Sequence, residues 1–185
     1  MVKTLSALVG VAVIGVMAWI AAGPIPAAQT PIPVLPDFGA PRAMIVPVKG
    51  VDPSALRDTF NELRGSRRHE AIDILAPRGT PVIAADDGFV KKLFTSVPGG
   101  LTVYEFDPDQ RFCYYYAHLD SYASGLHEGQ LLHRGEILGY VGTSGNARKD
   151  TPHLHFALIR LDPDRRWWKG TYLDPYPLLA GNATP

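Results

Sequence analysis

Short apolar runs separated by polar, turn-forming residues fill the chain beyond residue 43. Glycine, proline, aspartate or asparagine stands between one run and the next. Many short strands with such regular turn signals predict an all-β sandwich or barrel. A further short candidate strand lies at residues 45–48. The main expected strands are residues 71–75, 81–85, 88–94, 101–106, 112–118, 136–141 and 153–161.

A charge-free apolar run lies near the start of the chain, from Leu5 to Ala22, directly after the segment that contains Lys3. Its length of about 18 residues falls between a signal-peptide core and the ~20 residues that span a bilayer. The run therefore predicts either a cleaved secretory signal or an uncleaved membrane anchor, and both mean export. Prolines recur from Pro24 to Pro41, which favours an extended tether. We expect residues 1–29 to be the signal or anchor, 30–43 a proline-rich linker, 44–180 the folded domain and 181–185 a tail.

Charge and cysteine content narrow the functional classes. Lys plus Arg and Asp plus Glu both number 18, so the chain has no basic surplus of the kind that nucleic-acid binding requires. Apolar residues make up 46% of the chain, enough for a real core. Cys113 is the single cysteine, which excludes an internal disulfide; we expect a small buried side chain, with a catalytic thiol as the minor alternative. Trp167 and Trp168 are expected to pack on the outside of the domain.

Two histidines sit two residues apart in the last apolar run. Successive side chains of a strand point to opposite faces, so His153 and His155 would project from one face, roughly 7 Å apart at their Cα atoms. Leu154, Phe156 and Leu158 would point the other way, into the core. Two neighbouring imidazoles are costly to leave dry and unpaired, so this pair needs a metal, a carboxylate or a substrate.

A second group of candidate ligands lies upstream, at His69 and Asp73. Zinc binds histidine nitrogen and aspartate oxygen, and a catalytic zinc site keeps three protein ligands and one open position. We expect His69, Asp73 and one histidine of the later pair to close around a single zinc ion. His118 ends an aromatic run and is either an additional site residue or a hydrogen-bonded strand-end histidine. His127 and His133 flank polar turns and are expected to be solvated.

The blocks that carry these histidines resemble those of the lysostaphin-type, or LytM-like, zinc endopeptidases, which cut peptidoglycan peptides. The first block covers residues 69–82 and the second residues 116–119. Residues 139–145 and 152–156 match the last two blocks. All four occur in the order of the family, and the likeness runs from about residue 46 to residue 179.

The resemblance implies a small, mainly antiparallel β domain with a groove lined by loops. Carried over position by position, it implies His69, Asp73 and His155 as the ligands of one Zn²⁺ ion. It also implies His118 and His153 as catalytic histidines that do not bind the metal. The sequence leaves open which of these two is the general base.

Two positions depart from the family pattern. Ala71 stands where glycine is usual, and Ala157 stands where an acidic residue is common, so the groups around His155 are expected to differ.

The resemblance implies an exported endopeptidase that hydrolyses peptide bonds in peptidoglycan by metal-activated water. It would work in the periplasm or from the outer face of the inner membrane, and would touch a membrane only through its N-terminal segment. One alternative is a catalytically silent domain that binds peptidoglycan or activates another cell-wall hydrolase. Another is a metal-free β-barrel that binds a small ligand. The oligomeric state and the bond cut are not predicted.

Overall fold

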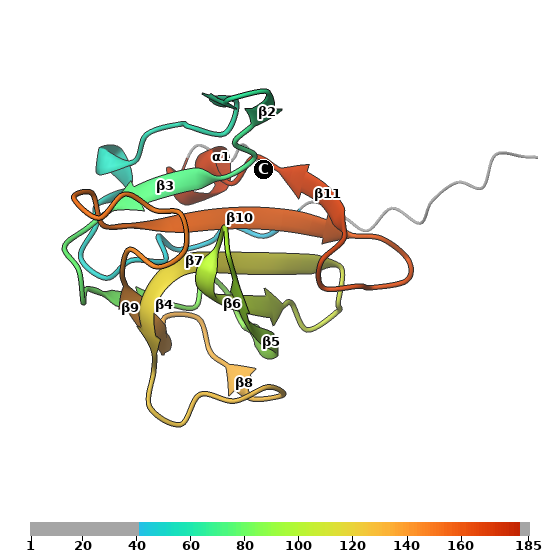
Figure 1. Cartoon of the computed structure of the whole chain (residues 1–185). Helices are drawn as coiled ribbons and strands as arrows, with labels where there is room; N and C mark the ends of the chain where they lie inside the picture. The colour runs from blue at the N-terminus through green and yellow to red at the C-terminus, as the bar shows by residue number, and fades with distance from the viewer. Residues whose placement is uncertain (1–40, 182–185) are drawn as a thin grey trace, which may run out of the picture. The chain divides into compact units, whose positions relative to one another are not determined.

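The computed structural model describes residues 41–181 (Figure 1). The predicted signal or anchor, most of the linker and most of the tail lie outside these residues. Within residues 41–181, none of the helices combines the length and the apolar character needed to cross a membrane. The elements are η1 (Pro53–Ala55), β1 (Leu63–Arg64), β2 (Arg67–Arg68), β3 (Ile72–Leu75), β4 (Pro81–Ile83), β5 (Gly88–Ser96), β6 (Gly100–Phe106), β7 (Phe112–Tyr122), β8 (Leu131–Leu132), β9 (Ile137–Val141), β10 (His153–Leu161), β11 (Gly170–Leu173) and α1 (Tyr176–Leu179).

The fold is built on a nine-stranded antiparallel sheet with the main order β11-β10-β7-β6-β5-β8. Strand β10 lies at its centre and pairs with β7, with β3 along its first half and with β11 along its second half (Figure 1). Strand β9 pairs with both β7 and β4. Every one of these pairings is antiparallel, which confirms the predicted fold class.

The main predicted strands are all present within a few residues of the expected bounds. The candidate strand at residues 45–48 is reduced to one isolated bridge, Val48 to Val82. Strands β1, β2, β8 and β11 were not predicted. They are two to four residues long and mostly exposed, so they carry no apolar pattern and exist through their pairing partners.

The sheet packs apolar side chains on both of its faces. Leu154, Phe156 and Leu158 of β10 are completely buried in the larger cluster, as the alternation along this strand predicts. Cys113 belongs to a smaller cluster together with Phe106, Ile159 and Leu161. Burial raises the pKa of its thiol well above the ordinary value. Cys113 is therefore an apolar packing residue, as expected from the sequence.

The side chain of Glu105 in β6 places a carboxyl group in the interior, where it is completely buried. Its Oε2 accepts a hydrogen bond of 2.6 Å from the hydroxyl of Tyr116, and that hydroxyl accepts one from the Ala85 amide. Its Oε1 has no hydrogen-bond partner among residues 41–181. Burial raises the pKa of Glu105 to about 8, against the opposing effect of the Tyr116 hydrogen bond.

This carboxyl should make stability depend on pH. The folded protein keeps a proton on Glu105 between the ordinary pKa of 4.5 and the raised value of about 8, whereas the unfolded chain releases it. The free energy of unfolding therefore falls as the pH rises through this interval. We expect Glu105→Gln, which cannot ionise, to lose less thermal stability than the unchanged protein when the pH rises from about 5 to about 8.5. The control is Glu62→Gln at an exposed position, which should lose as much thermal stability as the unchanged protein. An equal loss of thermal stability in Glu105→Gln and the unchanged protein would contradict this account.

Candidate active site

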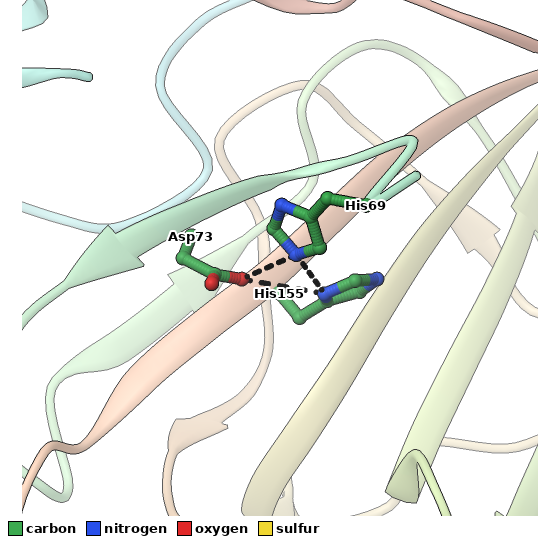
Figure 2. A group of neighbouring side chains, drawn as sticks. All are labelled: His69, Asp73 and His155. Atoms are coloured by element: carbon green, nitrogen blue, oxygen red, sulfur yellow. Dashed lines mark hydrogen bonds and ion pairs between the residues drawn. The ribbon is translucent and has the colours of Figure 1, made fainter. Parts of the chain in front are cut away.

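Three side chains converge where β3 and β10 pair. Asp73 and His155 are direct register partners on these strands, and His69 lies just before β3. The Nε2 atom of His69 is 3.0 Å from the Oδ1 atom of Asp73 and 3.0 Å from the Nδ1 atom of His155 (Figure 2). The Nδ1 atom of His155 is 3.3 Å from the same Oδ1 atom. The structure thus brings together the three residues that the sequence suggested as ligands.

The spacing of these three atoms fits the ligands of one metal ion. At metal–ligand distances of 2.0–2.1 Å, tetrahedral geometry places neighbouring ligand atoms roughly 3.3 Å apart. The Oδ1 atom of Asp73 is buried and contacts the imidazole nitrogens of His69 and His155. A buried carboxylate oxygen is costly unless a donor or a cation satisfies it, and a metal ion between these three atoms would do so. His69, Asp73 and His155 can therefore hold a divalent metal ion.

The protonation states of the three residues suit ligation. The Nδ1 atom of His69 lies 3.1 Å from the carbonyl oxygen of Thr59 and donates its hydrogen there, which leaves a lone pair on Nε2. Burial lowers the pKa of His155 and favours its neutral form. Burial alone would raise the pKa of Asp73, but the imidazoles of His155 and His69 outweigh it and hold that pKa well below the ordinary range. Neutral imidazoles and an ionised carboxylate are the forms that bind metals.

Arg64 of β1 holds the other oxygen of the Asp73 carboxylate. Its Nη2 atom donates to the Oδ2 atom of Asp73 over 2.9 Å and lies 3.1 Å from a carboxylate oxygen of Glu62. With Oδ2 bound in this way, Oδ1 faces the two histidines. Arg64 was not predicted as a site residue, because an arginine in a polar loop gives no local sign of its partner.

His118 and His153 lie beside the three candidate ligands. Their ring centroids are 5.0 Å apart, and the His118 ring is 5.6 Å from that of His155. Each places its Nδ1 atom against a backbone carbonyl oxygen, 2.9 Å to Ser144 for His118 and 2.8 Å to Thr151 for His153. In both residues Nδ1 is thereby the donor and Nε2 is the free proton acceptor. Burial lowers the pKa of His118 to about 4, helped by the nearby His155.

The backbone around His118 is unusual and explains how its ring is placed. His118 has a left-handed φ of 63°, in a region where β7 is bulged. Its amide donates to the carbonyl oxygen of Gly99 over 2.8 Å. The hydroxyl of Ser144 donates to the carbonyl oxygen of Leu119 and accepts from the amide of Leu101, so it ties the loop after β9 to β7, which carries His118, and to the neighbouring strand β6. Ser144 is a second positioning residue that sequence reasoning did not single out.

The five residues face a groove of about 430 Å³. His127 and His133 are exposed and lie outside it, as expected for solvated turn residues. The groove is also lined by Arg64, Leu75, Pro98, Tyr115, Arg148 and Thr151.

The antiparallel sheet and the His–Asp–His cluster in a groove are those of a metallopeptidase. Residues 67–175 match Peptidase family M23, and the chain belongs to this family.

Three relatives illustrate the likeness. The L-Ala–D-Glu endopeptidase of Bacillus subtilis is 35% identical over 131 residues, which cover 66% of this chain and 39% of the relative. The peptidoglycan DD-endopeptidase ShyC of Vibrio cholerae is 31% identical over 93 residues, which cover 50% of this chain and 20% of the relative. The catalytic domain of lysostaphin from Staphylococcus simulans superposes with a TM-score of 0.53 at 27% identity, over 63% of this chain and 81% of that one. The chain thus spans well under half the length of these two curated relatives.

The two departures from the family pattern lie in the interior. Ala71 and Ala157 are both completely buried. With alanine at position 157, β10 offers no carboxylate directly beyond Phe156. The ring of His155 instead contacts Tyr115, at 5.9 Å between centroids.

The packing of β6 against the loop that supports His118 should depend on glycine at position 100. Gly100 has a φ of 65°, and a Cβ atom there would collide with Ser144 and Gly145. Gly125 has a φ of 81° and open space around it, so it is a matched control. We expect Gly125→Ala to lower the free energy of unfolding by about 1–2 kcal/mol through backbone strain alone. Gly100→Ala should lower it further by about 1–3 kcal/mol because of the collision. Chemical denaturation of both variants tests this, and equal losses would refute it.

Proposed function

We propose that this protein is a zinc-dependent endopeptidase that hydrolyses peptide bonds in peptidoglycan. The observation that carries the proposal is the convergence of His69, Asp73 and His155 on one point of a groove, with His118 and His153 beside them. The Vibrio relative is named as an endopeptidase of peptidoglycan and the Bacillus relative as an endopeptidase of the L-Ala–D-Glu bond, which supports a peptidoglycan peptide as the substrate. The chain keeps every histidine of the motif and the aspartate, which favours activity over a catalytically silent domain.

Zinc is the metal that we propose for this site. Two imidazole nitrogens and one carboxylate oxygen form a ligand set typical of catalytic zinc, which leaves a fourth position for water. When bound, zinc acts as a Lewis acid and lowers the pKa of its water to about 7. His69, Asp73 and His155 would hold it, and Arg64 would orient Asp73.

His153 and His118 would move protons through their Nε2 atoms, because the Nδ1 atom of each is committed to a backbone carbonyl. We assign His153 as the general base. We assign His118 to the stabilisation of negative charge on the substrate carbonyl and to the delivery of a proton to the leaving amine. Burial lowers the pKa of His118 to about 4, so its ring is neutral in the resting site and would take up a proton at Nε2 before it donates one.

The N-terminal part of the chain fits work outside the cytoplasm. We propose that residues 1–29 direct export as a signal or an anchor, and that the linker at residues 30–43 holds the domain away from the membrane. The periplasm or the outer face of the inner membrane would then be its location.

Substitutions should separate metal ligands from proton-transfer residues. We expect His69→Ala, Asp73→Ala and His155→Ala to lose both bound zinc and hydrolysis. His118→Ala and His153→Ala should retain one zinc per chain and lose activity by roughly 10²–10⁴-fold, the usual contribution of general acid–base catalysis. Zinc is measured by elemental analysis, and hydrolysis by the muropeptides released from purified sacculi.

His127→Ala, which alters an exposed histidine, is the control and should change neither quantity. Full activity of His118→Ala or His153→Ala would overturn the role of that residue. A zinc-loaded protein that releases nothing from sacculi would instead support the silent-domain alternative.

Arg64 should matter for zinc affinity. We expect Arg64→Ala to weaken zinc binding by about 10-fold or more, the range seen when a group that orients a metal ligand is removed. Arg64→Lys should recover part of this loss, because a lysine keeps the charge but not the planar donor geometry. Competition with a chromophoric chelator measures the affinity without reference to activity. The exposed Arg67 of β2 provides the control Arg67→Ala, and an equal effect of both alanine variants would exclude an orienting role.

A further inference from the structure

A continuous strip of aromatic rings leads away from the active site. Tyr115 lines the groove, and its ring contacts that of Tyr104 at 4.7 Å between centroids. Tyr104 contacts Trp167 at 4.6 Å. Trp167 in turn contacts Phe94 at 5.2 Å and Trp168 at 5.1 Å. These five residues are called the aromatic strip below, and they come from β5, β6, β7 and the connection between β10 and β11.

Packing accounts for one end of the aromatic strip but not for the other. Tyr104, Tyr115 and Trp167 pack against the smaller apolar cluster of the sheet, which explains their burial. Trp168 and Phe94 are 58% and 39% exposed. Rings of this size normally contribute 150–250 Å² of burial, so an exposed pair that ring contacts connect to a residue of the groove marks a binding surface more than a core.

Charged groups border the exposed rings. The guanidinium of Arg166 lies 5.7 Å from the centroid of Trp168. Arg166 pairs with Asp164 at 3.0 Å, and Lys169 pairs with Asp162 at 3.0 Å. The rings are therefore flanked by hydrogen-bond donors and acceptors of both signs.

We propose that the aromatic strip binds the sugar chain of peptidoglycan while the groove holds the attached peptide. This inference rests on the proposed function. A pyranose ring offers a flat C–H face that packs on an aromatic ring, and an edge of hydroxyl and acetamido groups that needs polar partners. Trp168 and Phe94 supply the apolar faces, and the neighbouring charged side chains supply the polar partners.

The distance from the active site suits this arrangement. Four ring-to-ring steps separate His155 from Trp168, none longer than 5.9 Å. The path is therefore at most roughly 20 Å, the length of about six extended residues. A peptide in the groove is covalently joined to its sugar within such a length. A protein partner fits less well, because two exposed rings offer at most roughly 500 Å², whereas each side of a stable protein interface buries about 800 Å².

A binding experiment can test the surface independently of catalysis. The probe is the tetramer of N-acetylglucosamine, titrated into the full chain with and without a chelator and followed by NMR. We expect saturable shifts of the Trp167 and Trp168 indole signals under both conditions. Trp168→Ala and Phe94→Ala should each weaken binding of the tetramer by about three- to tenfold, because each removes one ring on which a sugar stacks. Leu131→Ala, at a 73% exposed apolar residue of β8, is the matched control and should bind like the unchanged protein.

A second measurement compares hydrolysis of a free peptide with that of the same peptide joined to its disaccharide. The rate for the disaccharide-linked peptide divided by the rate for the free peptide should fall in Trp168→Ala. This quotient should stay constant in Leu131→Ala. Saccharide binding without any hydrolysis would overturn the proposed function and keep this inference. An absence of saccharide shifts, binding that is unaffected by both aromatic substitutions, or a dimer that Trp168→Ala dissociates would overturn the sugar-binding surface.

Discussion

The antiparallel register between β3 and β10 is the constraint on which the active site depends. It sets Asp73 opposite His155 and thereby places a carboxylate oxygen 3.3 Å from an imidazole nitrogen. Because side chains alternate along a strand, a slip of one residue would turn His155 toward the core and Leu154 toward the groove. The complete burial of Leu154 and Phe156 makes such a slip costly. The core of the sheet therefore fixes the geometry of the candidate metal ligands.

Backbone carbonyls determine which nitrogen of each histidine is available. The carbonyl oxygens of Thr59, Ser144 and Thr151 accept from the Nδ1 atoms of His69, His118 and His153 respectively. Each contact leaves the corresponding Nε2 atom as an acceptor in the groove. His155 differs from the other three histidines, because its Nδ1 atom faces the candidate ligands. The loops that supply these carbonyls thus decide which ring nitrogen of each histidine is the acceptor.

Two of the four non-glycine residues with a left-handed φ in the described part of the chain lie at the site. Glu70 and His118 have φ values of 56° and 63°, in a left-handed region that costs a residue with a side chain about 1–2 kcal/mol. Glu70 follows one candidate ligand, and His118 is itself a site residue. Hydrogen bonds hold both, from the amide of Glu70 to Phe60 and from the amide of His118 to Gly99. Surrounding structure that overdetermines such residues is characteristic of functional sites.

The sequence by itself determined the all-β class, the main strands and the face of β10 that carries His153 and His155. These features follow from period-two patterns and turn residues, which are local properties. The motif blocks also identified His69, Asp73 and His118. Only the tertiary structure showed that Arg64 holds Asp73, that Ser144 supports His118, and that Trp168 joins a strip leading to the groove. Those contacts join residues far apart in the chain, such as Leu101 and Ser144, which are 43 positions apart. Strand register and loop packing decide such contacts, and no local pattern of residues encodes strand register or loop packing.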